Sequence, residues 1–338
     1  MDLALLDQTL AAHGEPRFRA GQIWAWAARG ADGYEQMTNL PKALRETLAR
    51  ELPFSSLTLA EEASASDGTI KALFQTTDGR PLEAVLMRYR DRRRSICVSS
   101  QSGCPLTCTF CATGQMQFGR NLSAGEILDQ ALHFRRLGPV DHAVFMGMGE
   151  PMMNLDAVLA ACERLPDLGI SHRHTAISTV GWIPGIDRLA QTPMPIRLAL
   201  SLHAADESLR SELMPVNERY PLADVLDACR AHYAARRRTV FIEYVMLAGV
   251  NDRYEQALAL ARALSRGRSG EPVMFKVNLI PYNPTDLGEG DPYRCSTRES
   301  IAAFRAALEA RGVRVTVRLT RGREIAAACG QLAAGAAA

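Results

Sequence analysis

Short apolar runs that alternate with helix-length amphipathic segments most constrain how this chain can fold. The apolar runs lie at 95–98, 143–146, 175–178, 196–201, 240–245 and 275–280. Strands separated by helices are typical of parallel β/α units, and six such units are two short of a closed barrel. We therefore predict an α/β protein built on a partial (β/α)6 barrel, with 313–317 as a candidate further strand.

Two smaller units precede the predicted barrel. Residues 1–56 show helical spacing of apolar residues, and we expect a helical accessory domain. Residues 57–90 contain strand-like runs at 70–74 and 82–86 around the turn Asp78-Gly79, which predicts a β-hairpin linker. The barrel then occupies 91–325, and 326–338 form a C-terminal segment.

The amino-acid composition is typical of a globular protein and indicates in which compartment the protein occurs. The chain has 338 residues, 47% of them hydrophobic, and no apolar stretch approaches the roughly 20 residues of a membrane span. The N-terminus shows no leader pattern, so we expect a cytoplasmic protein that binds no membrane. The net charge of +2 is too small to indicate a nucleic-acid partner by itself. Five arginines within 88–94 are open to two interpretations, a solvated loop or an RNA contact.

Three of the eight cysteines gather in one loop after the first barrel strand. The segment Cys104-Pro105-Leu106-Thr107-Cys108-Thr109-Phe110-Cys111 spaces them as Cys-x3-Cys-x2-Cys. Disulfides are rare in a reducing cytosol, so this spacing favours metal or redox chemistry. A structural zinc site needs four ligands, and no neighbouring Cys or His completes the set. Zinc with a distant fourth ligand and a redox disulfide remain alternatives.

A four-iron cluster held by three cysteines leaves one iron open to a ligand. That iron can bind S-adenosylmethionine and deliver an electron to its sulfonium group. The spacing, with an aromatic residue before the last cysteine, resembles the radical SAM superfamily. The resemblance implies a [4Fe-4S] cluster on Cys104, Cys108 and Cys111, with S-adenosylmethionine as second cofactor.

Further motifs along the chain resemble the RlmN/Cfr family of radical SAM RNA adenine methyltransferases. They are Cys97, Met148-Gly149-Glu150-Pro151, Leu200-Ser201-Leu202-His203-Ala204, Asn278-Leu279-Ile280-Pro281-Tyr282-Asn283-Pro284 and Ala328-Cys329-Gly330-Gln331-Leu332. The last of these, taken with Cys97, is specific to that family. Pro151 is more similar to the branch that methylates carbon 2 of adenine than to the carbon-8 branch.

The resemblance implies roles for three residues. Cys329 takes a methyl group from one S-adenosylmethionine, and a second molecule generates the radical that activates this methyl group. The base then becomes attached to Cys329, Glu83 removes a proton from the ring, and Cys97 releases the product through a transient Cys97–Cys329 disulfide. For Glu83, a solvated carboxylate on the hairpin is the alternative.

The same resemblance implies a binding site for S-adenosylmethionine at the strand ends. Its candidate residues are Gly149, Glu150, Ser178, Ser201, Leu202, His203 and Asn283. An exposed loop acid is the alternative for Glu150, and strand-end capping is the alternative for Ser178, Ser201, His203 and Asn283. Cys162, Cys229 and Cys295 are assigned to packing.

These inferences predict an enzyme that methylates carbon 2 of an adenosine in 23S rRNA, with tRNA as a second candidate substrate. We expect a monomer that depends on an electron donor. Carbon 8 of the same adenosine is the close alternative. A noncatalytic iron–sulfur protein that binds RNA is an alternative of another class, and it would not need Cys97, Cys329 or a ligand pocket.

Overall fold

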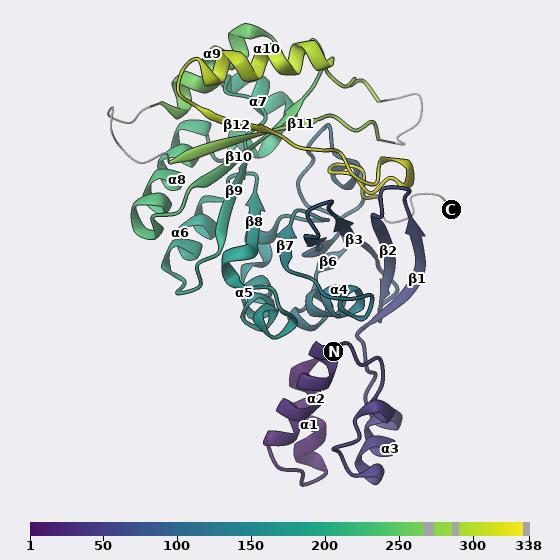
Figure 1. Cartoon of the computed structure of the whole chain (residues 1–338). Coiled ribbons are helices and arrows are strands. Elements are labelled where there is room, and N and C mark those ends of the chain that lie inside the picture. The colour runs from purple at the N-terminus through teal and green to yellow at the C-terminus, as the bar shows by residue number, and fades with distance from the viewer. Residues whose placement is uncertain (266–273, 286–290, 334–338) are drawn as a thin grey trace.

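The computed structural model describes residues 1–265, 274–285 and 291–333. Its N-terminal helices are α1 (Leu3–Ala12), α2 (Phe18–Arg29) and α3 (Lys42–Glu51), with the short helix η1 (Tyr34–Gln36) between the last two. Asp2 begins α1 by accepting hydrogen bonds from the amides of Ala4 and Leu5. These helices form a unit that projects from the rest of the molecule (Figure 1). The N-terminal helices expected from the sequence are therefore present.

One ten-stranded sheet organises the rest of the chain. Its order is β1-β2-β3-β4-β7-β8-β9-β10-β11-β12. The strands are β1 (Leu57–Ser64), β2 (Ile70–Thr76), β3 (Pro81–Arg88), β4 (Arg94–Cys97), β7 (His142–Phe145), β8 (Thr175–Thr179), β9 (Arg197–Ser201), β10 (Val240–Met246), β11 (Phe275–Pro281) and β12 (Arg314–Val317). Neighbours from β4 to β12 are parallel, whereas β1 to β4 are antiparallel. The sheet confirms the predicted partial barrel, and β12 is the further strand.

Helices connect the parallel strands and cover one side of the sheet (Figure 1). They are α4 (Ala124–Arg136), α5 (Leu155–Arg164), α6 (Ile183–Gln191), α7 (Glu207–Leu213), α8 (Leu222–Arg236), α9 (Tyr254–Leu264) and α10 (Arg298–Glu309). Short 3₁₀ segments lie at Ala112–Gln115, Pro151–Asn154, Leu165–Leu168, His172–His174, Pro215–Glu218 and Arg323–Ile325. One continuous apolar core includes residues of these helices, of the N-terminal unit and of the sheet. Within the described residues, no helix is long and apolar enough to cross a membrane.

The predicted hairpin lies in β2 and β3, and the structure adds β1 as a third strand. Strand β1 pairs with β2 from Leu57↔Thr76 to Ser64↔Ile70. Most of its residues are exposed, so its apolar pattern is weak. Strand β3 pairs with β4 through Val85↔Cys97, which makes the hairpin continuous with the barrel. Residues 334–338 of the predicted C-terminal segment lie outside the described residues.

A small second sheet encloses the cysteine loop. Strands β5 (Gln101–Ser102) and β6 (Arg120–Asn121) pair antiparallel on either side of it. Gly103 has φ +72°, and a Cβ there would lie 2.5 Å from the Gln117 carbonyl oxygen. Only glycine therefore fits at this turn into the loop.

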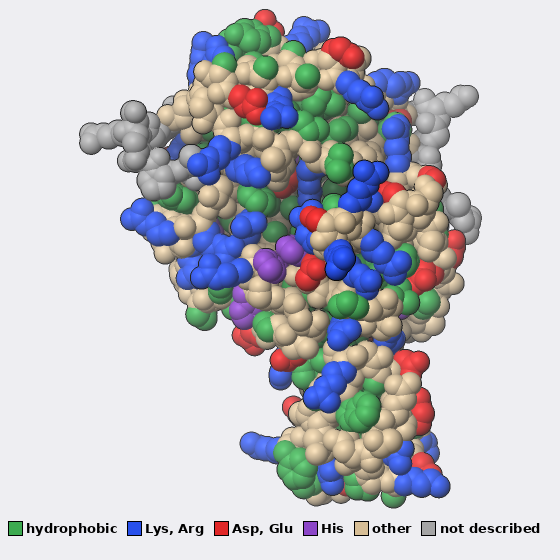
Figure 2. Space-filling view, viewed as in Figure 1, with side chains coloured by type: hydrophobic (Ala, Val, Ile, Leu, Met, Phe, Trp, Pro, Cys, Tyr) green, Lys and Arg blue, Asp and Glu red, His purple; other side chains and the backbone are tan. Residues whose placement is uncertain are grey.

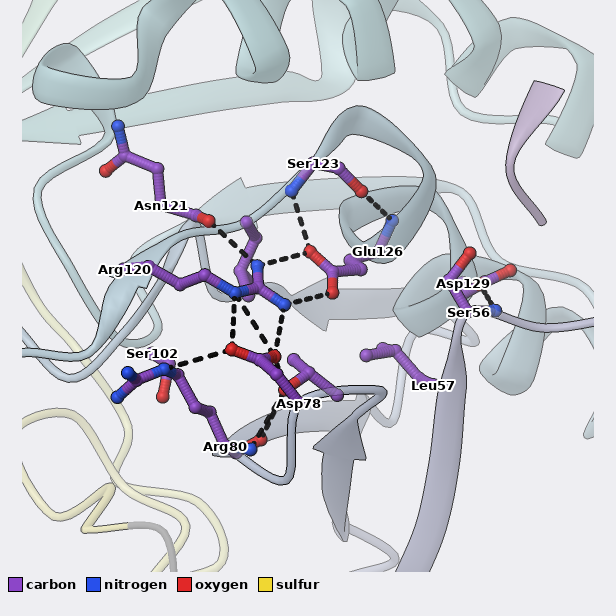
Figure 3. A network of polar contacts seen from close by, with 12 residues as sticks. Ser56, Leu57, Asp78, Arg80, Ser102, Arg120, Asn121, Ser123, Glu126 and Asp129 are labelled. Atoms are coloured by element: carbon purple, nitrogen blue, oxygen red, sulfur yellow. Dashed lines mark hydrogen bonds and ion pairs between the residues drawn. The ribbon is translucent and has the colours of Figure 1, made fainter. Parts of the chain in front are cut away.

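Arg120 fastens the loop to two other elements. Its Nη2 lies 2.7 Å from Asp78 in the β2–β3 turn and 2.7 Å from Glu126 in α4 (Figure 3). Glu126 also belongs to a capping box with Ser123 at the start of α4. These ion pairs fix the end of the hairpin against the loop that carries the three cysteines.

Candidate active site

Cys104, Cys108 and Cys111 lie together in the loop between β5 and β6, and all three are free, half-buried thiols. Burial raises the pKa of Cys104 to about 12 and raises the pKa of Cys111. Burial and then the neighbouring Cys111 and Cys104 thiols raise the pKa of Cys108. Three thiolates so close together need cationic compensation, which iron supplies in an iron–sulfur cluster. The donor set therefore fits a [4Fe-4S] cluster with one open iron.

The zinc alternative gains no support from this arrangement. Among the residues that the structure describes, no three His, Cys, Asp or Glu side chains are placed to hold a single metal ion. The ligands of a four-iron cluster bind different iron atoms, so they are spaced more widely than ligands of one ion. A fourth ligand for mononuclear zinc is thus not provided by the described part of the chain.

A cavity of about 160 Å³ opens beside the loop at the carboxyl ends of the strands. Its lining includes Cys111, Gly149, Glu150, Ser178, Ser201, His203 and Cys329. Five of the predicted S-adenosylmethionine residues are among these, and they come from the ends of β7, β8 and β9. The Oγ atoms of Ser178 and Ser201 lie 3.2 Å apart. The carboxyl ends of successive parallel strands thus converge on one cavity.

Glu150 is the buried acid of this cavity. It is only 3% exposed, so the exposed-loop interpretation is wrong. Its carboxylate accepts hydrogen bonds from the amides of Met152 at 3.0 Å and Val180 at 2.9 Å. Burial raises its pKa to about 7. A cationic ligand group in the cavity would stabilise the ionised carboxylate.

Gly149 sets the course of the backbone before Glu150. Its φ is +91°, and a Cβ would lie 2.4 Å from the Cβ of Gln101. The Gln101 side-chain oxygen accepts the Glu150 amide at 2.8 Å. Any larger residue at 149 would displace Gln101 and therefore Glu150.

His203 is a neutral wall residue of the same cavity. Burial, and then the charge of Arg210, lower its pKa to about 3. Its Nδ1 accepts the Val245 amide at 3.0 Å, which leaves the proton on Nε2. The ring packs edge-to-face on Phe110 at 4.8 Å, and the backbone is left-handed at φ +59°. This strained residue therefore connects the cysteine loop to the end of β9.

A second cavity of about 50 Å³ is lined by the thiols of Cys97 and Cys329, the two cysteines outside the three-cysteine loop to which the family resemblance assigns a role. Cys97, Asn283 and Cys329 are among its walls, and Cys329 also borders the first cavity. Burial, and then the neighbouring Cys329, raise the pKa of the Cys97 thiol to about 12. The Asn283 side-chain amide donates to the Cys329 carbonyl at 3.3 Å. Asn283 thus holds the backbone of Cys329 and borders only the second cavity.

Glu83 lies near this cavity but is not one of its walls. It is 3% exposed and lies 2.9 Å from the Lys71 ammonium, so the solvated-hairpin interpretation is wrong. Its Oε2 accepts the amide of Ala333 at 2.9 Å. Leu332, which precedes Ala333 in the chain, lines the second cavity.

Leu202 does not line either cavity and is wholly buried in the core. Its carbonyl oxygen accepts the Nε of buried Arg210 at 3.3 Å. Cys162 and Cys229 are also completely buried. Cys295 is half-buried, and its backbone forms an isolated antiparallel β-bridge with that of Leu247.

Two charged residues of the site escaped the sequence analysis. Arg318 borders both cavities, and its guanidinium lies 3.4 Å from Glu243, a wall of the first cavity. The Glu243 carboxylate is the largest influence that raises the pKa of Arg318. Asn278 donates to the other Glu243 oxygen at 2.8 Å. A glutamate within the apolar run 240–245 was the signal that could have revealed this pair.

A partial barrel whose strand ends surround a three-cysteine loop defines a radical SAM protein. The family model for the radical SAM superfamily matches residues 98–261. The model for the ribosomal RNA large subunit methyltransferase N-terminal domain matches residues 1–52. The chain belongs to the RlmN family of radical SAM RNA methyltransferases. Membership of the radical SAM superfamily implies a [4Fe-4S] cluster and S-adenosylmethionine as cofactors.

Full-length relatives support this assignment. A Chloroflexus aurantiacus protein named “Probable dual-specificity RNA methyltransferase RlmN” is 48% identical, with 98% of this chain and 91% of that protein covered. The dual-specificity RNA methyltransferase RlmN of Anaeromyxobacter sp. is 43% identical over 99% of this chain and 89% of its own. The crystal structure of a radical SAM methyltransferase from Sphaerobacter thermophilus is 44% identical, with a TM-score of 0.91 and coverage of 99% and 98%.

Proposed function

We propose that the chain methylates carbon 2 of an adenosine in 23S rRNA and that tRNA is a second substrate. The observation that carries this proposal is the place of Cys329, which borders the cavity with Glu150 and the cavity with Cys97. A thiol that serves as methyl carrier must meet a methyl donor on one side and the target base on the other. The order of motifs, including Pro151, supports carbon 2.

The cluster and S-adenosylmethionine supply, when bound, the methyl group and a radical strong enough to activate it. Cys104, Cys108 and Cys111 would hold the cluster. Glu150 would face the ammonium group of S-adenosylmethionine, and the Ser178 and Ser201 hydroxyls would contact its polar groups. We propose two molecules of S-adenosylmethionine per methylated base.

Cys329 acts as the methyl carrier in this proposal. It is the exposed member of the two thiols, whereas Cys97 is buried. The guanidinium of Arg318 borders both cavities, and its positive charge opposes the effect of burial on the pKa of Cys97. A thiolate at 329 can displace a methyl group from a sulfonium, and the methylated sulfur can then face the second cavity.

Cys97 and Glu83 complete the sequence of steps. After a carbon–carbon bond ties the base to Cys329 and the adduct passes one electron to a one-electron acceptor, Glu83 takes up the ring proton. Cys97 then loses its thiol proton and attacks the Cys329 sulfur, the carbon–sulfur bond breaks with its electron pair on the former methyl carbon, and that carbon takes up a proton. A Cys97–Cys329 disulfide and the methylated base result. In the structure the Ala333 amide contacts one Glu83 oxygen and the Lys71 ammonium contacts the other.

RNA contact is assigned to the helices of residues 1–56 and to the arginines of 88–94. The match of residues 1–52 to the methyltransferase N-terminal domain supports this assignment. The proposal also requires an external one-electron donor, and it treats the chain as a cytoplasmic monomer.

The test is incubation of the reduced, cluster-loaded chain with methyl-labelled S-adenosylmethionine and either a 23S rRNA fragment or tRNA. Digestion and mass spectrometry against carbon-2 and carbon-8 methyladenosine standards should reveal the carbon-2 product. A carbon-8 product would overturn the position. Binding of RNA with neither 5′-deoxyadenosine release nor methylation would favour the noncatalytic alternative.

A further inference from the structure

One exposed apolar side chain lies at the mouth of the cavity that contains both thiols. Leu319 is 76% exposed, more than any other large hydrophobic residue in the described part of the chain, and it lines the second cavity. Single exposed leucines are common on protein surfaces and need no explanation. Leu319 differs from these because it lines the cavity that Cys97 and Cys329 also line.

The backbone on both sides of Leu319 is anchored. The Arg318 amide donates to the Leu279 carbonyl at 2.8 Å. On the other side, the Arg321 side chain donates to the Asp67 carbonyl at 3.2 Å, and the Gly322 backbone amide donates to the Asp67 carboxylate at 3.1 Å. Leu319 is therefore held in its exposed position by neighbours that are fixed to β11 and to the β1–β2 turn.

Positive charge surrounds the same mouth. Tyr89 lines the second cavity, and the guanidinium carbons of Arg93 and Arg321 lie 4.1 and 5.0 Å from its ring centroid. Lys and Arg side chains gather around a hollow near the middle of the larger part of the molecule (Figure 2). The Arg321 guanidinium also donates to the Asp67 carbonyl, and Arg93 lies 4.0 Å from Asp91. A guanidinium has five N–H groups, so each arginine retains donors for a phosphate oxygen beside these contacts.

We propose that Leu319 is an apolar wedge that packs on the base next to the target nucleotide when that nucleotide leaves the RNA stack and enters the cavity. Arg93 and Arg321 hold the flanking phosphates in this arrangement. The proposal rests on the proposed function, since it assigns the RNA contacts of that site. An enzyme that acts on a stacked base must extrude it, and apolar side chains inserted beside the gap favour extrusion.

The charges around Leu319 favour RNA over a protein as the occupant. A hydrophobic contact alone would suit either partner. Two arginines fixed on one tyrosine at the same mouth match a phosphate backbone with unstacked bases.

The test uses the cluster-loaded full chain and a 23S rRNA fragment with 2-aminopurine at the target position. The C2 amino group of this analogue blocks methylation, and its fluorescence rises when it leaves the stack. Leu319→Ser should lose at least half of the fluorescence rise and reduce methylation of unlabelled RNA tenfold or more, whereas Leu319→Met should keep both. Leu137→Ser is the matched control, because Leu137 is also exposed and lines neither cavity.

Methylation of Cys329 in the absence of RNA separates this proposal from the proposed function. Leu319→Ser should methylate Cys329 like the wild type, because the wedge acts only on RNA. If Leu319→Ser shows wild-type fluorescence and wild-type RNA methylation, the proposal that Leu319 packs on an RNA base is wrong. The same conclusion holds if the variant keeps both properties and instead loses a protein partner. A wild-type chain that methylates neither Cys329 nor RNA would overturn the proposed function itself.

Discussion

The Lys71 ammonium lies 2.9 Å from a carboxylate oxygen of Glu83, inside the antiparallel part of the sheet. The two residues belong to neighbouring strands β2 and β3, and the pairing Leu73↔Glu83 places them diagonally on one face. The contact with Lys71 holds the buried Glu83 side chain in place near the cavity that both thiols line.

Glu83→Gln should block product release and leave the earlier steps intact. The amide fills the same space, but it cannot take up the ring proton. We expect free methylated RNA to fall by about 10²–10⁴-fold, the range of general base catalysis, while Cys329 is still methylated and RNA stays attached to it. Mass spectrometry of the protein and a denaturing gel measure both. Glu62→Gln on β1 serves as control, and normal turnover by Glu83→Gln would remove Glu83 from the reaction.

Glu150 should make the cluster-free protein less stable as the pH rises. Its pKa is about 7 in the folded chain and 4.5 when unperturbed, so between these values the folded state binds the additional proton. Stability is then lost as the pH rises through that window, by about 3 kcal/mol at most. Urea unfolding between pH 4.5 and 7 should show this decline, and Glu150→Gln should flatten it. The exposed Asp156→Asn variant should behave like the wild type, and a decline unchanged by Glu150→Gln would contradict the assignment.

Anaerobic reconstitution should load four irons and four sulfides onto the three-cysteine loop. Replacing Cys104, Cys108 or Cys111 by Ala should abolish that loading, because each thiolate binds a different iron. Cys295→Ala, a half-buried thiol outside the loop, should load normally. Iron and sulfide analysis with the visible absorbance measures the outcome. Stoichiometric zinc without iron absorbance would refute the cluster.

The arginine-rich turn between β3 and β4 should contribute to RNA binding through phosphates. Changing Arg92, Arg93 and Arg94 to Ala should flatten the dependence of log Kd on log salt by a unit or more. Fluorescence anisotropy between low and physiological salt measures the slope. Changing Arg298, Arg305 and Arg311 on and after α10 provides a control of equal charge. An unchanged slope in the first variant would return the turn to the solvated-loop interpretation.

The sequence predicted the barrel because each buried parallel strand is a continuous apolar run. The run 240–245 became β10 (Val240–Met246), and 275–280 became β11 (Phe275–Pro281). Strand β1 was not predicted as a separate strand, because only Leu57 of its residues is buried. Its position depends on pairing with β2, which is a tertiary contact.

In the site, too, features set by local sequence could be predicted, whereas features set by tertiary contacts could not. The cysteine loop was visible because its ligands lie within eight residues of one another. The burial of Glu83 depends on Lys71 and Ala333, and Arg318 meets Glu243 across 75 positions of the chain. Such contacts are set by the order of strands in the sheet and not by local spacing. Leu202, predicted from its motif, lines neither cavity, because its side chain is wholly buried in the apolar core.

Cys97 and Cys329 are placed differently relative to the two cavities. Cys329 borders both cavities, whereas Cys97 borders only the second, so the two variants should fail at different steps. Cys329→Ala should lose methylation and retain no RNA, because the methyl carrier is missing. Cys162→Ala, a buried thiol outside both cavities, is the matched control and should turn over normally.

The decisive measurement is a denaturing gel of Cys97→Ala after reaction with RNA, S-adenosylmethionine and reductant. We predict a nuclease-sensitive band of retarded mobility, because the base becomes bonded to Cys329 and no thiol releases it. The band should disappear when Cys97 and Cys329 are both changed to Ala. Normal turnover by Cys97→Ala, or a crosslink that persists without Cys329, would contradict the account.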